Sequence, residues 1–120
     1  MSDLAIAHVT VDCADAGALA AFYAALLGRD VDPDPTEYFA TVGRVAGARP
    51  MLMFIKVPAR TPGKNSVHVD LHTTDMPREV ARAIGLGAKH VADFAEYGAV
   101  WTTLADPEGN LFDIGTPAAQ

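Results

Sequence analysis

The stretch HVTVDCADAGALAAFYAALLG, residues 8–28, predicts a β-strand followed by an α-helix. Its first six residues alternate between polar and apolar side chains, which is typical of a strand with one buried face. Asp15 is a suitable N-cap for the helix, and Gly28 is a typical C-terminal stop. Apolar residues at helical spacing between them predict one buried helical face: Leu19, Phe22, Tyr23, Leu26 and Leu27.

The same order of features returns in the second half of the chain. The stretch VHVDLHTTD, residues 67–75, predicts another strand that ends at a capping aspartate, and Gly87 ends the helix that follows. Strand-like segments come after each helix, at residues 37–45, 50–57, 88–94, 98–106 and 110–115. We therefore predict an α+β fold in which two βαβββ modules form a curved mixed sheet around a concave cavity.

The chain of 120 residues predicts a single domain, residues 1–120, because this length can bury a hydrophobic core. We place the two modules at about residues 1–58 and 66–117. Residues 57–66, VPARTPGKNS, are rich in Pro, Gly and polar side chains. This composition indicates a linker, at about residues 59–65.

The overall charge narrows the partners that we expect. A formal net charge of −6 argues against nucleic acid or an anionic membrane, which both favour a basic surface. The single cysteine excludes an internal disulfide, and no apolar run resembles a signal peptide or a membrane span. We expect a cytoplasmic protein that binds a small molecule and forms a homodimer.

The strand alternation predicts which side chains face the cavity. Valines and a leucine take the helix-packed face of the first strand in each half. The polar side chains then point the opposite way, toward the cavity: His8, Thr10, Asp12, His68, Asp70 and His72.

Together with the closing DPEGNLFDI, residues 106–114, the stretch 8–28 resembles the vicinal oxygen chelate superfamily. This superfamily includes glyoxalase I, the extradiol dioxygenases and the fosfomycin and bleomycin resistance proteins, and the resemblance covers nearly the whole chain. It implies a metal centre in the concave sheet, with His8, His68 and Asp113 as ligands. Asp113 is a departure from the pattern, because glutamate is usual at that position.

Two histidines and a carboxylate form the facial triad of Fe(II) oxygenases, and the same set also binds Mn, Ni, Co or Zn. The alternative is that both histidines are neutral residues of the cavity wall, with no metal present. His72 is either a rim residue or a general base, since histidine exchanges protons near neutral pH. Asp70 either orients a neighbouring histidine or adds solvated polarity at the cavity mouth.

Five residues are predicted to contact the substrate, namely Thr10, Met51, Met53, Ile55 and Trp101. In some glyoxalases the strand that corresponds to residues 50–57 supplies a glutamate ligand. Met51, Met53 or Ile55 would occupy that place here, so the four-ligand set of glyoxalase I is incomplete. These three side chains form either an apolar floor for substrate or part of the core. Trp101 either lines the cavity or packs beneath a helix.

These features predict a metal-dependent enzyme similar to glyoxalases or dioxygenases, of the lyase, isomerase or dioxygenase type. Its substrate would be a small molecule that offers two oxygen atoms to a divalent metal. The main alternative is a non-catalytic protein of the bleomycin-resistance type that binds a drug or metabolite. A third is a substrate-binding or regulatory domain that has kept the fold without the chemistry.

Overall fold

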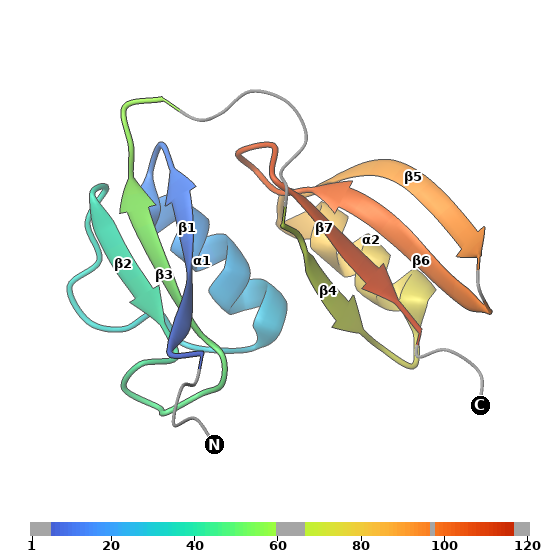
Figure 1. Cartoon of the computed structure of the whole chain (residues 1–120), viewed down its shortest axis with the longest axis horizontal. Helices are drawn as coiled ribbons and strands as arrows, with labels where there is room; N and C mark the ends of the chain where they lie inside the picture. Colours follow the sequence, from blue (N-terminus) through green and yellow to red (C-terminus); the bar gives the residue numbers. More distant parts are fainter. Residues whose placement is uncertain (1–5, 60–66, 97, 117–120) are drawn as a thin grey trace, which may run out of the picture. The chain divides into compact units, whose positions relative to one another are not determined.

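The computed structural model describes residues 6–59, 67–96 and 98–116. The elements follow one another as β1, α1, β2, β3, β4, α2, β5, β6 and β7 (Figure 1). The chain divides into two units, residues 1–60 and 61–120. The predicted linker at about residues 59–65 lies, apart from Ala59, outside the described residues.

Unit 1 contains one helix and a three-stranded mixed sheet. Its elements are β1 (His8–Cys13), α1 (Ala16–Leu27), β2 (Phe39–Val42) and β3 (Met51–Lys56). The strand order is β1-β3-β2, with β1 parallel to β3 and β2 antiparallel to it. The first half has no full strand near Val31, which makes only an isolated bridge to Val42. Pro33 and Pro35 follow this bridge, and a proline cannot donate a ladder hydrogen bond.

The helix α1 begins and ends at the predicted caps. A side-chain oxygen of Asp15 accepts a hydrogen bond of 3.1 Å from the backbone amide of Ala18. Gly28 has a φ of 66°, in the left-handed region that glycine adopts without a steric penalty. Both cap predictions are confirmed.

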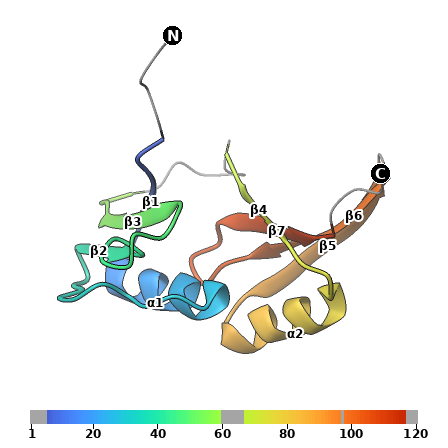
Figure 2. The ribbon, with the colours of Figure 1, turned by 90° about the horizontal axis from the view of Figure 1, so that it is seen from below.

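The core of unit 1 lies between α1 and one face of its sheet. Phe54 is fully buried, and its ring stacks on Tyr23 with the ring centres 5.8 Å apart. Leu52 is buried on the same side. Met51, Met53 and Ile55 alternate with these two residues and are only partly buried, on the face that carries no helix (Figure 2).

Unit 2 contains one helix and a four-stranded mixed sheet. Its elements are β4 (Val69–His72), α2 (Met76–Leu86), β5 (Lys89–Glu96), β6 (Ala99–Ala105) and β7 (Leu111–Gly115). The strand order is β4-β7-β6-β5, with β4 parallel to β7 and the other pairs antiparallel. Two helices and two mixed sheets confirm the predicted α+β class, and the order of elements is consistent with two βαβββ modules.

The helix α2 covers one face of the sheet of unit 2 (Figure 2). A side-chain oxygen of Asp75 accepts a hydrogen bond of 3.2 Å from the amide of Arg78, as predicted for an N-cap. Ala83 is the buried residue of this helix, and Leu104, Phe112 and Ile114 are buried in the sheet. The opposite face of the sheet is thereby left to the polar and aromatic side chains that form the candidate site.

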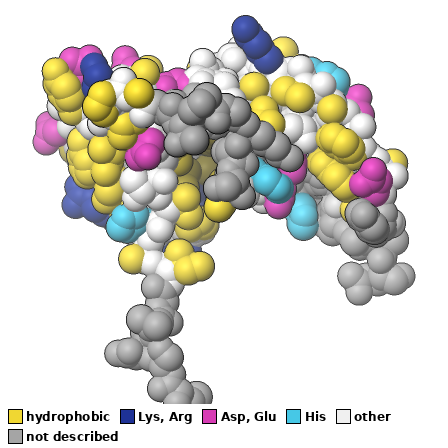
Figure 3. Space-filling model, turned by 45° about the horizontal axis from the view of Figure 1, so that its top comes forward, with side chains coloured by type: hydrophobic (Ala, Val, Ile, Leu, Met, Phe, Trp, Pro, Cys, Tyr) yellow, Lys and Arg dark blue, Asp and Glu magenta, His cyan; other side chains and the backbone are white. Residues whose placement is uncertain are grey.

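No described helix is long and apolar enough to cross a membrane. On the face drawn in Figure 3, the Lys and Arg side chains of the described residues lie apart from one another. Histidine and acidic side chains adjoin on that face, beside hydrophobic ones.

Candidate metal centre

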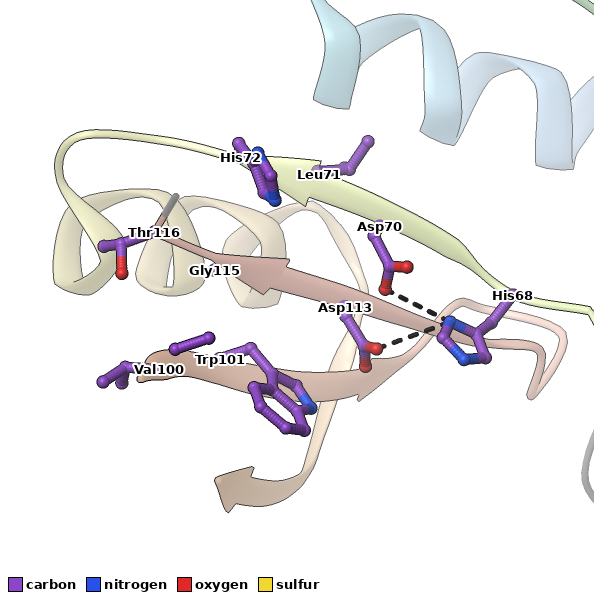
Figure 4. Close-up of a pocket in the computed structure, with 10 residues that line it drawn as sticks. His68, Asp70, Leu71, His72, Val100, Trp101, Asp113, Gly115 and Thr116 are labelled. Carbon is purple, nitrogen blue, oxygen red and sulfur yellow. Dashed lines mark ion pairs between the residues drawn. The ribbon is translucent and has the colours of Figure 1, made fainter. Parts of the chain in front are cut away.

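Three side chains of unit 2 bring potential metal ligands together: His68, Asp70 and Asp113. One ligand atom from each lies within 4.8 Å of the others. The Nδ1 atom of His68 is 3.2 Å from Oδ1 of Asp70 and 3.4 Å from Oδ2 of Asp113 (Figure 4). This cluster is the strongest candidate for a functional centre among the described residues.

Strand pairing explains why these residues meet. Asp70 of β4 and Asp113 of β7 are direct partners in the parallel register, so their side chains point to the same face. His68 lies two residues before Asp70, and a spacing of two keeps a side chain on one side of an extended chain. The cluster therefore follows from one strand pair and the alternation along β4.

The geometry of the cluster fits a divalent cation. Metal bonds to imidazole nitrogen and carboxylate oxygen are about 2.0–2.2 Å long, which places neighbouring ligand atoms about 2.8–3.6 Å apart in octahedral or tetrahedral sites. The two distances from His68 Nδ1, 3.2 and 3.4 Å, lie within this range. One nitrogen and two carboxylates are also a set that Mn, Fe and Zn accept.

Thr103 of β6 orients Asp113 from the other side. Its Oγ1 donates a hydrogen bond of 2.6 Å to Oδ1 of Asp113, and the two residues are partners in the antiparallel register. This leaves Oδ2 directed toward His68. The sequence analysis did not select Thr103, because its only signal was a cross-strand position that depends on the register.

The electrostatic environment of Asp113 favours a bound cation. Burial raises the pKa of its carboxyl, since only 14% of the side chain is exposed, and the hydrogen bond and charge of Asp70 raise the pKa further. The hydrogen bond from Thr103 and the charge of His68 act in the opposite direction without cancelling this effect. A cation between the two carboxylates would remove their mutual repulsion.

A pocket of about 270 Å³ adjoins the cluster. Its lining comprises His68, Asp70, Leu71, His72, Ala99, Val100, Trp101, Asp113, Gly115 and Thr116. Figure 4 shows His72 and Trp101 on strands to either side of β7. Trp101 thus lines a pocket, which was one of its two predicted locations.

Sequence comparison gives the family. The family model for a glyoxalase-like domain matches residues 8–115. The chain belongs to the glyoxalase-like domain family. No curated protein matches it in sequence.

Solved structures share the fold of this glyoxalase-like protein at low sequence identity. A glyoxalase/bleomycin resistance protein/dioxygenase family enzyme from Burkholderia phytofirmans has a TM-score of 0.74 and 22% identity, over 92% of this chain and 96% of the other. The bleomycin-binding protein of Streptomyces verticillus, complexed with copper(II)-bleomycin, has a TM-score of 0.66 and 17% identity, over 98% and 99%.

A third structure is a variant of the fosfomycin resistance protein FosX from Listeria monocytogenes. It is complexed with Mn(II) and a dihydroxypropylphosphonic acid, and it has a TM-score of 0.76 and 12% identity, over 98% of this chain and 93% of the other. These neighbours and the family match confirm the predicted resemblance to the vicinal oxygen chelate superfamily.

The remaining predicted site residues of this glyoxalase-like protein lie in unit 1. His8 and Thr10 are exposed on β1, and their register partners on β3 are Met51 and Met53. Ile55 continues the same face of β3. His8 belongs to unit 1, whereas His68 and Asp113 belong to unit 2. That these three residues share one metal stays a prediction from the family resemblance.

Proposed function

We propose that this protein is a metal-dependent enzyme of the glyoxalase or dioxygenase type, acting on a small molecule that offers two oxygen atoms. The convergence of His68, Asp70 and Asp113 beside a pocket carries this proposal. The Mn(II) in the FosX structure supports it, because that protein shares the fold. The family match alone is insufficient, since related folds host different chemistries.

Two residues, Asp70 and His8, are candidates for the third protein ligand, and in both cases His68 and Asp113 would also hold the metal. Asp70 supplies that ligand within unit 2, and His8 supplies it in the assignment implied by the resemblance. A divalent cation bound there polarises substrate oxygens and stabilises negative charge that develops on them. Thr103 donates a hydrogen bond to Oδ1 of Asp113 and thereby keeps this carboxylate in a ligating orientation.

His72 is the residue that we propose to transfer the substrate proton. It lies two residues beyond Asp70 on β4 and lines the same pocket, so a ligand at the cluster extends toward its ring. If His8 supplies the third ligand, Asp70 instead orients His68: Nδ1 would donate to Asp70 over the 3.2 Å contact and leave Nε2 to bind the metal. The nearby Trp101 reduces the access of water to the bound substrate.

Metal titration of the purified protein tests this proposal. Isothermal titration with Mn²⁺ and Zn²⁺, together with elemental analysis, should give one bound ion per chain. His68→Ala and Asp113→Ala should each weaken binding by at least about tenfold. His90→Ala is the matched control, because His90 is an exposed histidine of unit 2 outside the pocket lining. Absence of stoichiometric metal in the wild type, or equal losses in all three variants, would contradict the proposal.

A second candidate function is metal-free binding of a drug or metabolite. The apolar part of the pocket lining favours it: Leu71, Ala99, Val100 and Trp101. This function predicts that an aromatic ligand raises the melting temperature in the presence of EDTA, and that His68→Ala leaves this increase unchanged.

We also propose that the protein forms a homodimer. Ile84, Leu86 and Val91 of unit 2 expose between 39% and 49% of their surface, which is unfavourable for apolar side chains in water. Light scattering coupled to size exclusion should give twice the chain mass of 12.6 kDa, or about 25 kDa in total. A mass equal to one chain at micromolar concentration would contradict this.

A further inference from the structure

One row of residues crosses the open face of the sheet of unit 2 next to the ligand cluster. Gly115 of β7 pairs with His72 of β4 on one side and with Trp101 of β6 on the other. Trp101 in turn pairs with Phe94 of β5. Register partners point to the same face of a sheet, so His72, Trp101 and Phe94 all point toward the side of the cluster.

Gly115 leaves a gap in this row. The strands on either side of β7 are separated by about 9–10 Å, twice the usual strand spacing. Gly115 contributes no side chain to the middle of that distance, and the pocket is lined by His72, Gly115 and Trp101. A Cβ atom at Gly115 would lie 2.9 Å from Cβ of Trp101 and 2.8 Å from the carbonyl oxygen of Val100. The glycine therefore both allows close packing of β6 and keeps the gap open.

The indole of Trp101 forms one wall of the gap and is supported from behind. Its ring stacks on Phe94 with centres 5.2 Å apart and an angle of 18° between the planes. Phe94 lies on the opposite side of Trp101 from Gly115, in the strand order β7-β6-β5. Two stacked rings hold a flat surface at the pocket with less conformational freedom than a single exposed side chain would have.

The next row along the same strands is polar. Asp70 and Asp113 precede His72 and Gly115 by two residues and share their face. The pocket therefore has a polar part at the cluster and an adjoining apolar gap, as Figure 4 shows for the labelled side chains. Apolar cavities of about 150 Å³ hold one benzene ring. A volume of about 270 Å³ then suits one ring with a few polar atoms.

We propose that the gap between His72 and Trp101, over Gly115, is a recognition site for a planar ring. The ligand is a molecule with a single aromatic ring whose oxygen-bearing end reaches Asp113 and His68. Only the placement of that oxygen-bearing end rests on the proposed function. The ring site itself depends on Trp101, on Phe94 and on the fact that residue 115 is a glycine, which has no side chain.

Three matched hydroxy acids test the ring preference. Lactate, mandelate and hexahydromandelate carry the same vicinal hydroxyl and carboxylate, with a methyl, a planar phenyl or a non-planar cyclohexyl group. With Mn²⁺ present, titration calorimetry should show mandelate binding about 2- to 10-fold more tightly than hexahydromandelate, and lactate most weakly. Trp101 is the only tryptophan of the chain, so mandelate should also change the intrinsic fluorescence.

Variants assign the preference to Trp101. Trp101→Leu should reduce the ratio of the two affinities to about one, and Trp101→Phe should retain part of it because a planar ring remains. Tyr38→Leu removes another exposed aromatic ring, in unit 1, and should change nothing. Circular dichroism verifies that each variant is folded. Equal affinity of wild type for mandelate and hexahydromandelate, binding of neither acid although Mn²⁺ binds, or a preference that survives Trp101→Leu would overturn the ring site.

A second pair of probes separates the ring site from the metal centre. Benzyl alcohol and cyclohexylmethanol are uncharged and need no cation, so they are titrated in EDTA. A preference for benzyl alcohol that Trp101→Leu abolishes supports the ring site, whether or not Mn²⁺ binds. Failure of the wild type to bind Mn²⁺ would contradict only the metal-dependent function. Normal Mn²⁺ binding without any ring preference overturns the ring site and leaves the metal-dependent function standing.

Discussion

Thr103 and Asp113 form a 2.6 Å hydrogen bond across neighbouring strands, from the threonine Oγ1 to the aspartate Oδ1. The other carboxylate oxygen, Oδ2, lies 3.4 Å from Nδ1 of His68. The two oxygens of Asp113 therefore have different partners, one in the sheet and one in the ligand cluster. Aspartate has one methylene fewer than glutamate and therefore a shorter reach. The hydrogen bond from Thr103 limits the orientations that this short side chain samples.

Thr103→Val should weaken metal binding without removing a ligand. Valine has nearly the shape of threonine but cannot donate to Asp113, so the carboxylate loses its fixed orientation. Loss of such an outer partner typically costs about 10- to 100-fold in metal affinity. Competition titration with a chelating dye measures the change for Mn²⁺ or Zn²⁺.

Thr102→Val is the matched control for this experiment. Thr102 is the adjacent threonine of β6, and its Oγ1 donates a 2.8 Å hydrogen bond to Asp93. By strand alternation it lies on the opposite face of the sheet from Thr103. Unchanged metal affinity in Thr103→Val, or equal losses in both variants, would show that Thr103 does not orient the ligand.

Asp70→Asn should weaken metal binding by at least about tenfold, because it removes a ligand charge within the cluster. The same titration of His8→Ala measures the ligand that the family resemblance implies. A large loss with Asp70→Asn and none with His8→Ala would assign all three protein ligands to unit 2. If Asp70→Asn binds metal as the wild type does, Asp70 is not a ligand.

Asp32→Asn should destabilise the protein most at neutral pH. Asp32 is buried and accepts hydrogen bonds from Thr41 Oγ1 at 2.6 Å and from the amides of Arg44 and Val45, both at 2.9 Å. Burial acts to raise its pKa, but these hydrogen bonds outweigh burial and hold the pKa below the ordinary value. The ionised carboxylate therefore stabilises the fold above about pH 4, and this stabilisation is lost as the pH falls through the lowered pKa.

Urea unfolding at pH 7 and pH 3 measures this effect. The variant should lose about 1–3 kcal/mol of unfolding free energy at pH 7, and the difference from wild type should shrink at pH 3. Asp34→Asn provides the control, since Asp34 is an exposed neighbour whose positive φ of 66° asparagine tolerates. A difference that is the same at both pH values would contradict the role of the charge.

Gly115→Ala should destabilise the sheet of unit 2 by about 1–3 kcal/mol, because its Cβ would meet a backbone oxygen at 2.8 Å. Gly85→Ala is the opposite case. Gly85 lies within α2, and a Cβ there meets nothing within 4 Å. Alanine should stabilise that helix by about 0.5–1 kcal/mol. Thermal unfolding of both variants measures the contrast, and a Gly115→Ala variant as stable as wild type would show that β6 can move away.

Local sequence signals were sufficient for the elements of this fold. The alternation in residues 8–13 and the caps Asp15, Gly28 and Asp75 act over a few residues, and the structure has them where the pattern placed them. The βαβββ pattern also requires a strand directly after the first helix, but the chain there forms only the bridge of Val31 to Val42. Pro33 and Pro35 follow this bridge, and proline cannot donate a ladder hydrogen bond.

The candidate site was only partly predictable, because its contacts depend on register. His68 and Asp113 were selected through the family resemblance, and Asp70 through its position between two histidines on one strand face. The pairing of Asp70 with Asp113 joins residues that are far apart in the chain, and that of Asp113 with Thr103 depends on the register of two consecutive strands. No local pattern states which residue of one strand will stand opposite which residue of another.

The position of β7 has a consequence for the order in which this protein is made and folded. It is the last strand of unit 2, yet it lies between β4 and β6. Among the described strands β4 pairs only with β7, so residues 69–72 can form their strand hydrogen bonds only after residues 112–115 have been synthesised. This pairing closes a long loop of intervening chain, which carries an entropic cost. A nascent chain that has not yet extended beyond Leu111 holds Asp70 without its partner Asp113. The two carboxylates can be brought together to bind an ion only after the ribosome has synthesised the chain past Asp113.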